Sequence, residues 1–407
     1  MSNISKITGS SLIVAGTAIG AAMLAMPIAS FSIGFFSSII LLIFMYCLST
    51  YTALVALEVN MAFGTALSIP RIAAKHSKVI GWFATCVLAI LFYSLLAAYI
   101  SGIAEITKTS IKSYYDIEVS QVLLKFIFTL LIFFLVSSYT KIVDLGNRFF
   151  FFLKIIVFIS MIVIFLPKIN VGNFDFQYQK SFNFSVSSLF VTIPIFFTAF
   201  GFHGSIPVII KYLDGNPKDS YYTFIIGSFV SLIVYFIWQS VVFGVLPEEG
   251  ELSFRLIQES DNTLGMFVQV LSKLAQKPIF EYITSIFSWL AIVTSLIGVG
   301  IGLFDFFIER EARHTGFINR IKAGVFTFFP PFIISLRGKE IFIKALSFAA
   351  ISLSILAIIL PVVFAFKLRR SKKSITYRYK APGGDIALIL AFFAGCVIIV
   401  SELITLF

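Results

Sequence analysis

Long apolar runs alternate with short polar segments along the whole chain. Each run is about 20 residues long, which is the length that an α-helix needs to cross roughly 30 Å of hydrocarbon. The pattern predicts an all-α membrane protein with about eleven transmembrane helices. We expect these helices at residues 8–31, 33–57, 80–104, 122–139, 148–166, 187–210, 221–246, 280–307, 322–336, 343–366 and 384–406.

The polar segments between the runs are short, and none has the composition of a flexible linker. We therefore expect one transmembrane domain over residues 1–407. Two polar segments are longer than the rest. Segment 58–79 predicts a surface helix on the inner side, and segment 247–279 predicts a solvated outer cap with some helix.

Composition agrees with solvation by lipid, because 59% of the residues are hydrophobic, 13% are charged and the mean hydropathy is +0.99. The net charge of +11 does not indicate a nucleic-acid partner. Most Lys and Arg residues lie in short loops between apolar runs, where basic charge sets membrane orientation. Their distribution, above all the stretch 367–380, favours an N-terminus in the cytoplasm and a C-terminus outside.

Several classes of site are not indicated. The cysteines Cys47, Cys86 and Cys396 all fall inside apolar runs, so we expect small core residues and neither a disulfide framework nor a metal site. No cluster of nucleophiles, carboxylates or metal ligands at one depth points to an enzyme, and no phosphate-binding loop points to ATP. We expect no cofactor and no obligatory protein partner.

The first span contains two glycines, Gly16 and Gly20, in a stretch of small residues. Glycines four apart indicate either close packing against another helix or a locally unwound helix. The span itself leaves both interpretations open.

The sixth span favours unwinding. Gly201 and Gly204 flank His203 at the middle of the run, and Pro207 removes a backbone donor just beyond. The physical alternative to a poor continuous helix is two half-helices whose free N–H and C=O groups face a cavity. A free α-amino acid needs such a place, with its carboxylate at half-helix N-termini and its ammonium on exposed carbonyls. Interrupted spans one and six predict an inverted repeat, with residues 8–166 and 187–366 as its halves and 384–406 as an extra helix.

Four phrases carry a resemblance to a known family: GTAIGAAMLAMP at 16–27, FTAFGFHGSIPVI at 197–209, GVGIGLFDF at 298–306 and FPPF at 329–332. The chain resembles the hydroxy/aromatic amino-acid permeases, and among them the bacterial tyrosine-specific ones. The resemblance implies an eleven-span, leucine-transporter-like fold with a five-plus-five repeat in the bacterial inner membrane. It also implies proton symport of an aromatic amino acid. Carriers of tryptophan and of serine or threonine belong to the same family, and sodium remains an alternative coupling ion.

The candidate substrate site combines both interruptions. Backbone donors of the first span would hold the carboxylate, and carbonyls and rings of the sixth span would hold the ammonium and the aromatic ring. On the third span, Tyr93 is a further candidate, and Tyr99 is either another or part of an interfacial aromatic belt. The main candidates are Gly16, Thr17, Ala18, Ile19, Gly20, Phe200, Gly201, Phe202, His203 and Gly204.

Proton coupling has three candidates, Lys154, His203 and Ser295. An ionisable group at membrane depth is a functional hypothesis by default, and His203 lies in mid-span. Lys154 would lie about 10 Å deep by helical rise, where it could also extend to the interface. The resemblance implies a lysine on the fifth helix in place of a bound cation. Ser288, Thr294 and Ser295 of span eight could line that position beside Lys154, or could bond to their own helix. Glu58 and Asp305 are candidates for gating or proton exit, or ordinary interface charges.

Overall fold

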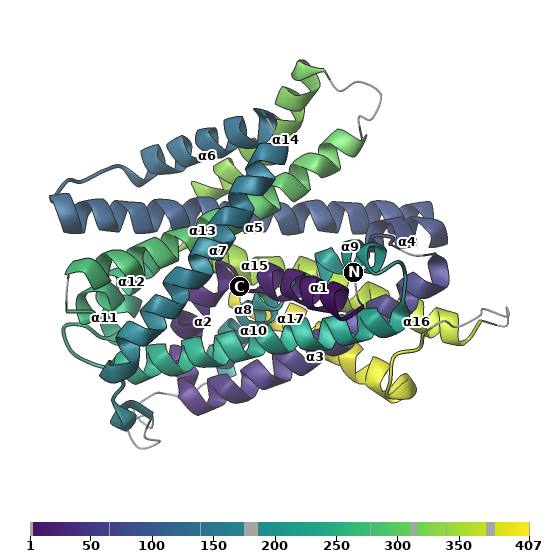
Figure 1. Cartoon of the computed structure of the whole chain (residues 1–407), viewed down its shortest axis with the longest axis horizontal. Coiled ribbons are helices and arrows are strands. Elements are labelled where there is room, and N and C mark those ends of the chain that lie inside the picture. The colour runs from purple at the N-terminus through teal and green to yellow at the C-terminus, as the bar shows by residue number, and fades with distance from the viewer. Residues whose placement is uncertain are drawn as a thin grey trace.

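The computed structural model describes residues 3–64, 66–138, 140–174, 186–276, 278–310, 316–338, 340–371 and 379–406. Within these ranges all regular structure is helical (Figure 1). The α-helices are α1 (Asn3–Ala18), α2 (Ala22–Ser30), α3 (Gly34–Phe63), α4 (Ile69–His76), α5 (Lys78–Tyr115), α6 (Gln121–Ser138), α7 (Thr140–Phe165), α8 (Val186–Ala199), α9 (Ile206–Tyr212), α10 (Pro217–Val245), α11 (Phe254–Gln258), α12 (Thr263–Leu274), α13 (Pro278–Arg310), α14 (Phe317–Ser335), α15 (Ile341–Ser354), α16 (Leu360–Arg369) and α17 (Gly384–Leu406).

Eight segments of the described chain are long and apolar enough to cross a membrane. This confirms a multi-pass, all-helical membrane protein. The segments are Ala22–Phe63, Lys78–Tyr115, Phe149–Lys168, Val186–Tyr212, Pro217–Val245, Ile279–Ile308, Ile341–Arg369 and Gly384–Leu406. The expected run 8–31 is divided between α1 and α2, the run 122–139 corresponds to the shorter apolar helix α6, and the run 322–336 lies in α14 with both prolines inside the helix.

Segment 58–79 contains the expected surface helix. In α4, Ile72 and Ala73 are buried whereas Arg71 and Lys75 are exposed, which is the amphipathic pattern of a helix lying on the protein. Segment 247–276 contains helix as expected, namely α11 and α12. The expectation that it is solvated is wrong for α12, because most of this helix, including Phe267 and Leu271, is buried against α5 and α13. The part of the basic stretch 367–380 from 372 to 378 lies outside the described residues.

The interrupted segments lie at the centre of the bundle. All nine residues of α2 are buried, as are the residues 192–199 that end α8. The long helix α10 packs along both α1 and α3, while α13 packs against α5 and α7. In Figure 1, α1, α2 and α8 lie among the longer helices α3, α5 and α10.

The outer surface of the bundle carries large apolar side chains such as Phe36, Ile40 and Phe134, as lipid-facing helices require. The expectation of three core cysteines is wrong on this point. Cys47 and Cys86 are exposed on that surface, and Cys396 is partly buried. A thiol is apolar enough to face lipid as readily as core, so an apolar run does not fix which side it takes.

Candidate functional site

The first span is interrupted between Ala18, where α1 ends, and Ala22, where α2 begins. Its two glycines have different roles. A Cβ on Gly16 would lie 2.9 Å from the ring of Phe151 in α7, so Gly16 permits close packing. Gly20 lies within the break, and a Cβ there would lie 2.7 Å from the Ser295 hydroxyl of α13. Both interpretations of the glycine pair therefore apply, one at each position.

The sixth span is interrupted after Ala199. Phe200 and Gly201 leave the helix, residues 202–205 form a 3₁₀ turn, and α9 restarts at Ile206 with Pro207 in its first turn. A Cβ on Gly201 would lie 2.8 Å from the Thr198 carbonyl oxygen, so a side chain there would require the backbone to shift. A Cβ on Gly204 would meet nothing within 4 Å, so this position faces open space.

The two interruptions meet at one side chain. The hydroxyl of Tyr235 in α10 lies 2.6 Å from the Ala18 carbonyl and 2.7 Å from the Ala199 carbonyl. One turn further along α10, the Trp238 indole donates to the Met23 carbonyl at 2.7 Å. That carbonyl lacks its usual helical donor, because the residue four positions later is Pro27, which has no N–H. The C-terminal ends of α1 and α8 are therefore brought together.

Lys154 reaches the first interruption from α7. Its ammonium donates to the Ile19 carbonyl at 2.8 Å and to the Thr294 hydroxyl at 3.3 Å, and it lies 4.8 Å from the centre of the Phe151 ring. The residue is 2% exposed, so the alternative in which it extends to the interface is wrong. A charge this deeply buried requires such partners.

Ser295 of α13 lies at the same break, where its hydroxyl oxygen accepts from the Ala21 amide at 3.0 Å. Lys154 and Ser295 thus bind residues 19 and 21 of the non-helical path, and Thr294 bonds to Lys154. The Ser288 hydroxyl instead donates to the Thr284 carbonyl of its own helix and is not part of this group.

His203 contacts α3 rather than the lysine group. Its Nε2 lies 2.8 Å from the Thr52 hydroxyl, and its ring stacks on Phe202 at 5.0 Å between centres. Its Nδ1 is buried without a hydrogen-bond partner among the described residues. A buried ring nitrogen without a partner is costly, so it is a candidate contact for a polar group of a ligand.

A cavity of about 760 Å³ extends from the molecular surface to His203 and Gly204. Its lining includes residues of α4 and the start of α5, among them Arg71 and Lys78, together with many apolar side chains. Asp305 of α13 also lies in its wall. We call it the α4–α9 cavity; the walls near His203 include Phe92, Leu353, Leu356 and Ala357.

Some predicted residues are not brought to the interruptions. Thr17 is exposed and bonds to the Ile13 carbonyl of its own helix. The Tyr93 hydroxyl donates to the Phe326 carbonyl of α14 at 2.9 Å, and Tyr93 is not in the cavity wall. Tyr99 is 6% exposed, so interfacial belt placement does not apply to it.

Glu58 forms a buried ion pair. Both its oxygens accept from Arg369 of α16, at 2.9 and 2.7 Å, and one also accepts from the Ala381 amide at 2.8 Å. Glu58 is therefore a paired charge, and this geometry does not support a role in proton exit.

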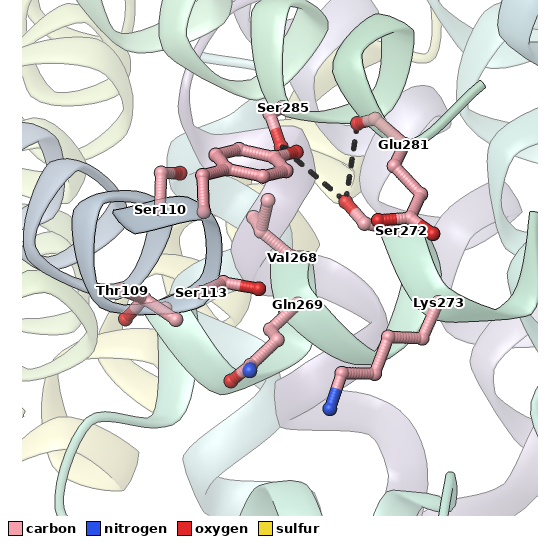
Figure 2. Close-up of a pocket in the computed structure, with 11 residues that line it drawn as sticks. Thr109, Ser110, Ser113, Val268, Gln269, Ser272, Lys273, Glu281 and Ser285 are labelled. Carbon is pink, nitrogen blue, oxygen red and sulfur yellow. Dashed lines mark hydrogen bonds between the residues drawn. The ribbon is translucent and has the colours of Figure 1, made fainter. Parts of the chain in front are cut away.

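A second, polar pocket lies between the end of α5, α12 and the start of α13 (Figure 2). Ser272 and Ser285 approach each other to 3.3 Å, and Ser285 also lies 3.2 Å from the Tyr114 hydroxyl. The space inside is about 10 Å³, enough for about one water molecule. It is a hydrogen-bonded helix junction and too small for an amino acid.

Tyr235 and Trp238 were not among the predicted site residues. The signal that indicates them is their depth: aromatic residues with polar groups usually lie near the ends of a span, whereas Tyr235 lies well inside the run 221–246. A hydroxyl at that depth requires a partner, and an unwound backbone offers one.

Comparison with known proteins gives the family. The model of the tryptophan/tyrosine permease family matches residues 3–402. The chain belongs to this family. Relatives of the permease include tyrosine-specific transport system 1 of Haemophilus influenzae, 35% identical over 97% of this chain and 95% of the relative. A tryptophan-specific transport protein of the same organism is 27% identical over 98% and 96%, and glutamine transporter 2 of Aliivibrio fischeri is 31% identical over 98% and 99%.

Among solved structures, the permease resembles a manganese transporter from Eremococcus coleocola, with a TM-score of 0.63 and 13% identity. The match covers 98% of this chain and 85% of the other. At this identity the likeness concerns the fold alone. The described residues contain no group of three or more His, Cys, Asp or Glu that could hold a metal ion.

Proposed function

We propose that this permease imports an aromatic amino acid, most readily tyrosine, across the bacterial inner membrane by proton symport with alternating access. Two relatives named as tyrosine-specific transport systems, 35% and 33% identical, support the substrate. The process needs no cofactor, no catalysis and no obligatory protein partner, only the membrane, the amino acid and the proton.

One observation carries the proposal: the carbonyl ends of α1 and α8 converge on a single point beside the N-terminus of α2. Helix C-termini carry partial negative charge and attract an ammonium group, whereas helix N-termini attract a carboxylate. At this end the amides of Ala21, Met23 and Leu24 are already bonded, to Ser295 and to the Gly20 and Ala21 carbonyls. The remaining amides, those of Gly20 and Ala22, are the candidate donors to a carboxylate. Both charges of an α-amino acid thus have complementary groups.

The side chain of the substrate would extend toward His203 and Gly204. Gly204 borders open space, and the neighbouring walls of the α4–α9 cavity are apolar and aromatic, as an aromatic ring requires. The unpartnered Nδ1 of His203 is a candidate partner for a phenolic hydroxyl.

Lys154 is the favoured proton carrier. When charged, it holds the Ile19 carbonyl strongly, because a hydrogen bond from a charged donor is about twice as strong as a neutral one. Loss of its proton would weaken this bond and free residues 19–21 to move. Ser295, which accepts from Ala21, would move with the same segment. Proton release would therefore be coupled to a change in the substrate site, and His203 is the second candidate.

The finer architecture belongs to the same proposal. We infer eleven spans, an inverted repeat of residues 8–166 and 187–366, an extra helix at 384–406 and a cytoplasmic N-terminus. The interruptions in spans one and six, five spans apart, support the repeat. The α4–α9 cavity would then open to the cytoplasm.

Tryptophan, serine or threonine remain alternative substrates, and sodium an alternative ion. The relative named a glutamine transporter shows that 31% identity spans proteins with different named substrates. Lys154 argues against sodium, because an ammonium already occupies the space beside Ile19 and Thr294.

Uptake of radiolabelled tyrosine into proteoliposomes tests the function. We expect an imposed inward proton gradient to drive uptake, and unlabelled tryptophan and phenylalanine to compete better than serine or glutamine. Uptake that needs sodium would exclude proton coupling by Lys154. Competition by serine or glutamine alone would exclude the aromatic substrate.

A further inference from the structure

The Tyr235 hydroxyl has one proton and two acceptors. It lies 2.6 Å from the Ala18 carbonyl and 2.7 Å from the Ala199 carbonyl, and each is the last helical residue before an interruption. A hydroxyl donates one hydrogen. At any moment, therefore, one of the two carbonyls receives less than a full hydrogen bond from it.

The position of this hydroxyl is fixed by its surroundings. Tyr235 is fully buried, and its ring meets Phe200 edge to face at 5.2 Å between centres. Three and four residues further along α10, Trp238 donates to Met23 and the Gln239 amide donates to the Ser30 hydroxyl at 3.0 Å. One face of α10 thus binds the first span at three heights.

The Lys154 ammonium donates to the neighbouring Ile19 carbonyl, whereas the Ala18 and Ala199 carbonyls themselves receive only the phenol. Both carbonyls belong to helix C-termini, where the backbone dipoles concentrate negative charge. A phenol offers them one neutral donor. An ammonium group would offer three donors and a full positive charge, and so could bond to both carbonyls at once.

We propose that the Tyr235 hydroxyl holds the place of the substrate's ammonium group while the site is empty. On binding, the ammonium donates to one or both carbonyls, and the Tyr235 hydroxyl loses the corresponding hydrogen bond while its ring stays in place. This inference rests on the proposed function, since it assumes that the ligand is a free amino acid. It makes Tyr235 a positioning residue that tunes affinity, in addition to its contact with both interrupted spans.

The proposal predicts that removing the Tyr235 hydroxyl strengthens the binding of the substrate. In Tyr235→Phe, both buried carbonyls lose their donor, and an arriving ammonium relieves that deficit. We expect tyrosine to bind at least about fivefold more tightly than to the wild type, since an unpaired buried acceptor is costly. Tighter binding without a matching gain in the transition between states slows release, so the uptake rate falls.

A second variant should have the opposite effect on the affinity for tyrosine. Replacing residue 235 by 4-aminophenylalanine keeps the ring and supplies two hydrogens, one for each carbonyl. The carbonyls are then satisfied in the empty protein, and we expect tyrosine to bind more weakly than to the wild type. A loss of packing would not raise the affinity for tyrosine in one variant and lower it in another of similar shape.

The experiment measures equilibrium binding of tyrosine and of 3-(4-hydroxyphenyl)propanoate, which lacks the ammonium, to purified protein. The second ligand should bind the wild type and both variants alike, which also reports that the site is folded. Tyr222→Phe is the matched control, because Tyr222 lies on the same helix and is 44% exposed. This variant should leave the affinity for both ligands unchanged.

Two failures are distinguishable. If the wild type binds neither ligand, the proposed function is wrong. If the wild type binds tyrosine but Tyr235→Phe weakens both ligands by the same factor, the hydroxyl is structural and the inference is overturned. Equal affinity of all three proteins for tyrosine would overturn it as well.

Discussion

Lys154 combines a positive charge with near-complete burial. Its partners are the Ile19 carbonyl, inside the first interruption, and the Thr294 hydroxyl of α13. In Lys154→Met the methionine fills similar space without charge or donors. We expect proton-driven tyrosine uptake to fall at least about a hundredfold, because an unpaired Ile19 carbonyl and a missing proton carrier act together. Uptake into proteoliposomes with an imposed gradient measures this. Lys218→Met, at an exposed position of α10, should transport normally; equal rates for both variants would remove Lys154 from the mechanism.

Gly20 offers a test of close approach. A Cβ at this position would lie 2.7 Å from the Ser295 hydroxyl oxygen but 3.9 Å from the Ser295 Cβ. Gly20→Ala should therefore impair folding or uptake, and Ser295→Ala in the same chain should recover part of the loss. Thermal unfolding and uptake of the two single variants and the double variant form a mutant cycle. Gly146→Ala, where a Cβ meets nothing within 4 Å, should be neutral. Strictly additive losses would contradict the clash.

At the scale of elements, the Glu58–Arg369 pair joins α3, α16 and the turn before α17. Both side chains are nearly or fully buried. Glu58→Gln leaves Arg369 with only the half-exposed Asp385 carboxylate at 3.7 Å as a counter-charge. We therefore expect the free energy of unfolding to fall by about 3 kcal/mol, the lower end of the range for a broken buried ion pair. Adding Arg369→Met to this variant should restore part of the lost free energy of unfolding. Unfolding in detergent measures both, with Glu249→Gln of the exposed Glu249–Arg255 pair as a control that changes little. A loss no larger than the control's would mean that the pair contributes nothing.

The positions of the interruptions were predictable from sequence, whereas their partners were not. Glycine and proline act locally on the backbone, so Gly20, Gly201 and Pro207 identify where a helix fails. Which side chains then satisfy the freed backbone depends on how α7, α10 and α13 pack, and this has no local signature. The same limit explains why Tyr93 was expected near the substrate: depth in a span says little about which face a residue occupies.

At the scale of the whole molecule, the α4–α9 cavity gives access to the sixth span from one side. We expect a cysteine at Gly204, in a chain whose own exposed cysteines Cys47 and Cys86 are replaced together with Cys396, to react with a membrane-impermeant thiol reagent from the cytoplasmic side. Tyrosine should protect it. Labelling of inside-out and right-side-out vesicles measures the difference. Reaction from the outer side alone would reverse the proposed orientation.

The hydrogen bond from Trp238 to the Met23 carbonyl has a consequence for synthesis. The two residues are 215 positions apart in the chain, and Pro27 prevents the first span from satisfying this carbonyl by itself. In lipid an unsatisfied carbonyl costs several kcal/mol. During synthesis, the Met23 carbonyl therefore lacks this donor until the helix at 217–245 has been inserted. We therefore expect a chain that ends before residue 217 to be less stable in the membrane than the full chain.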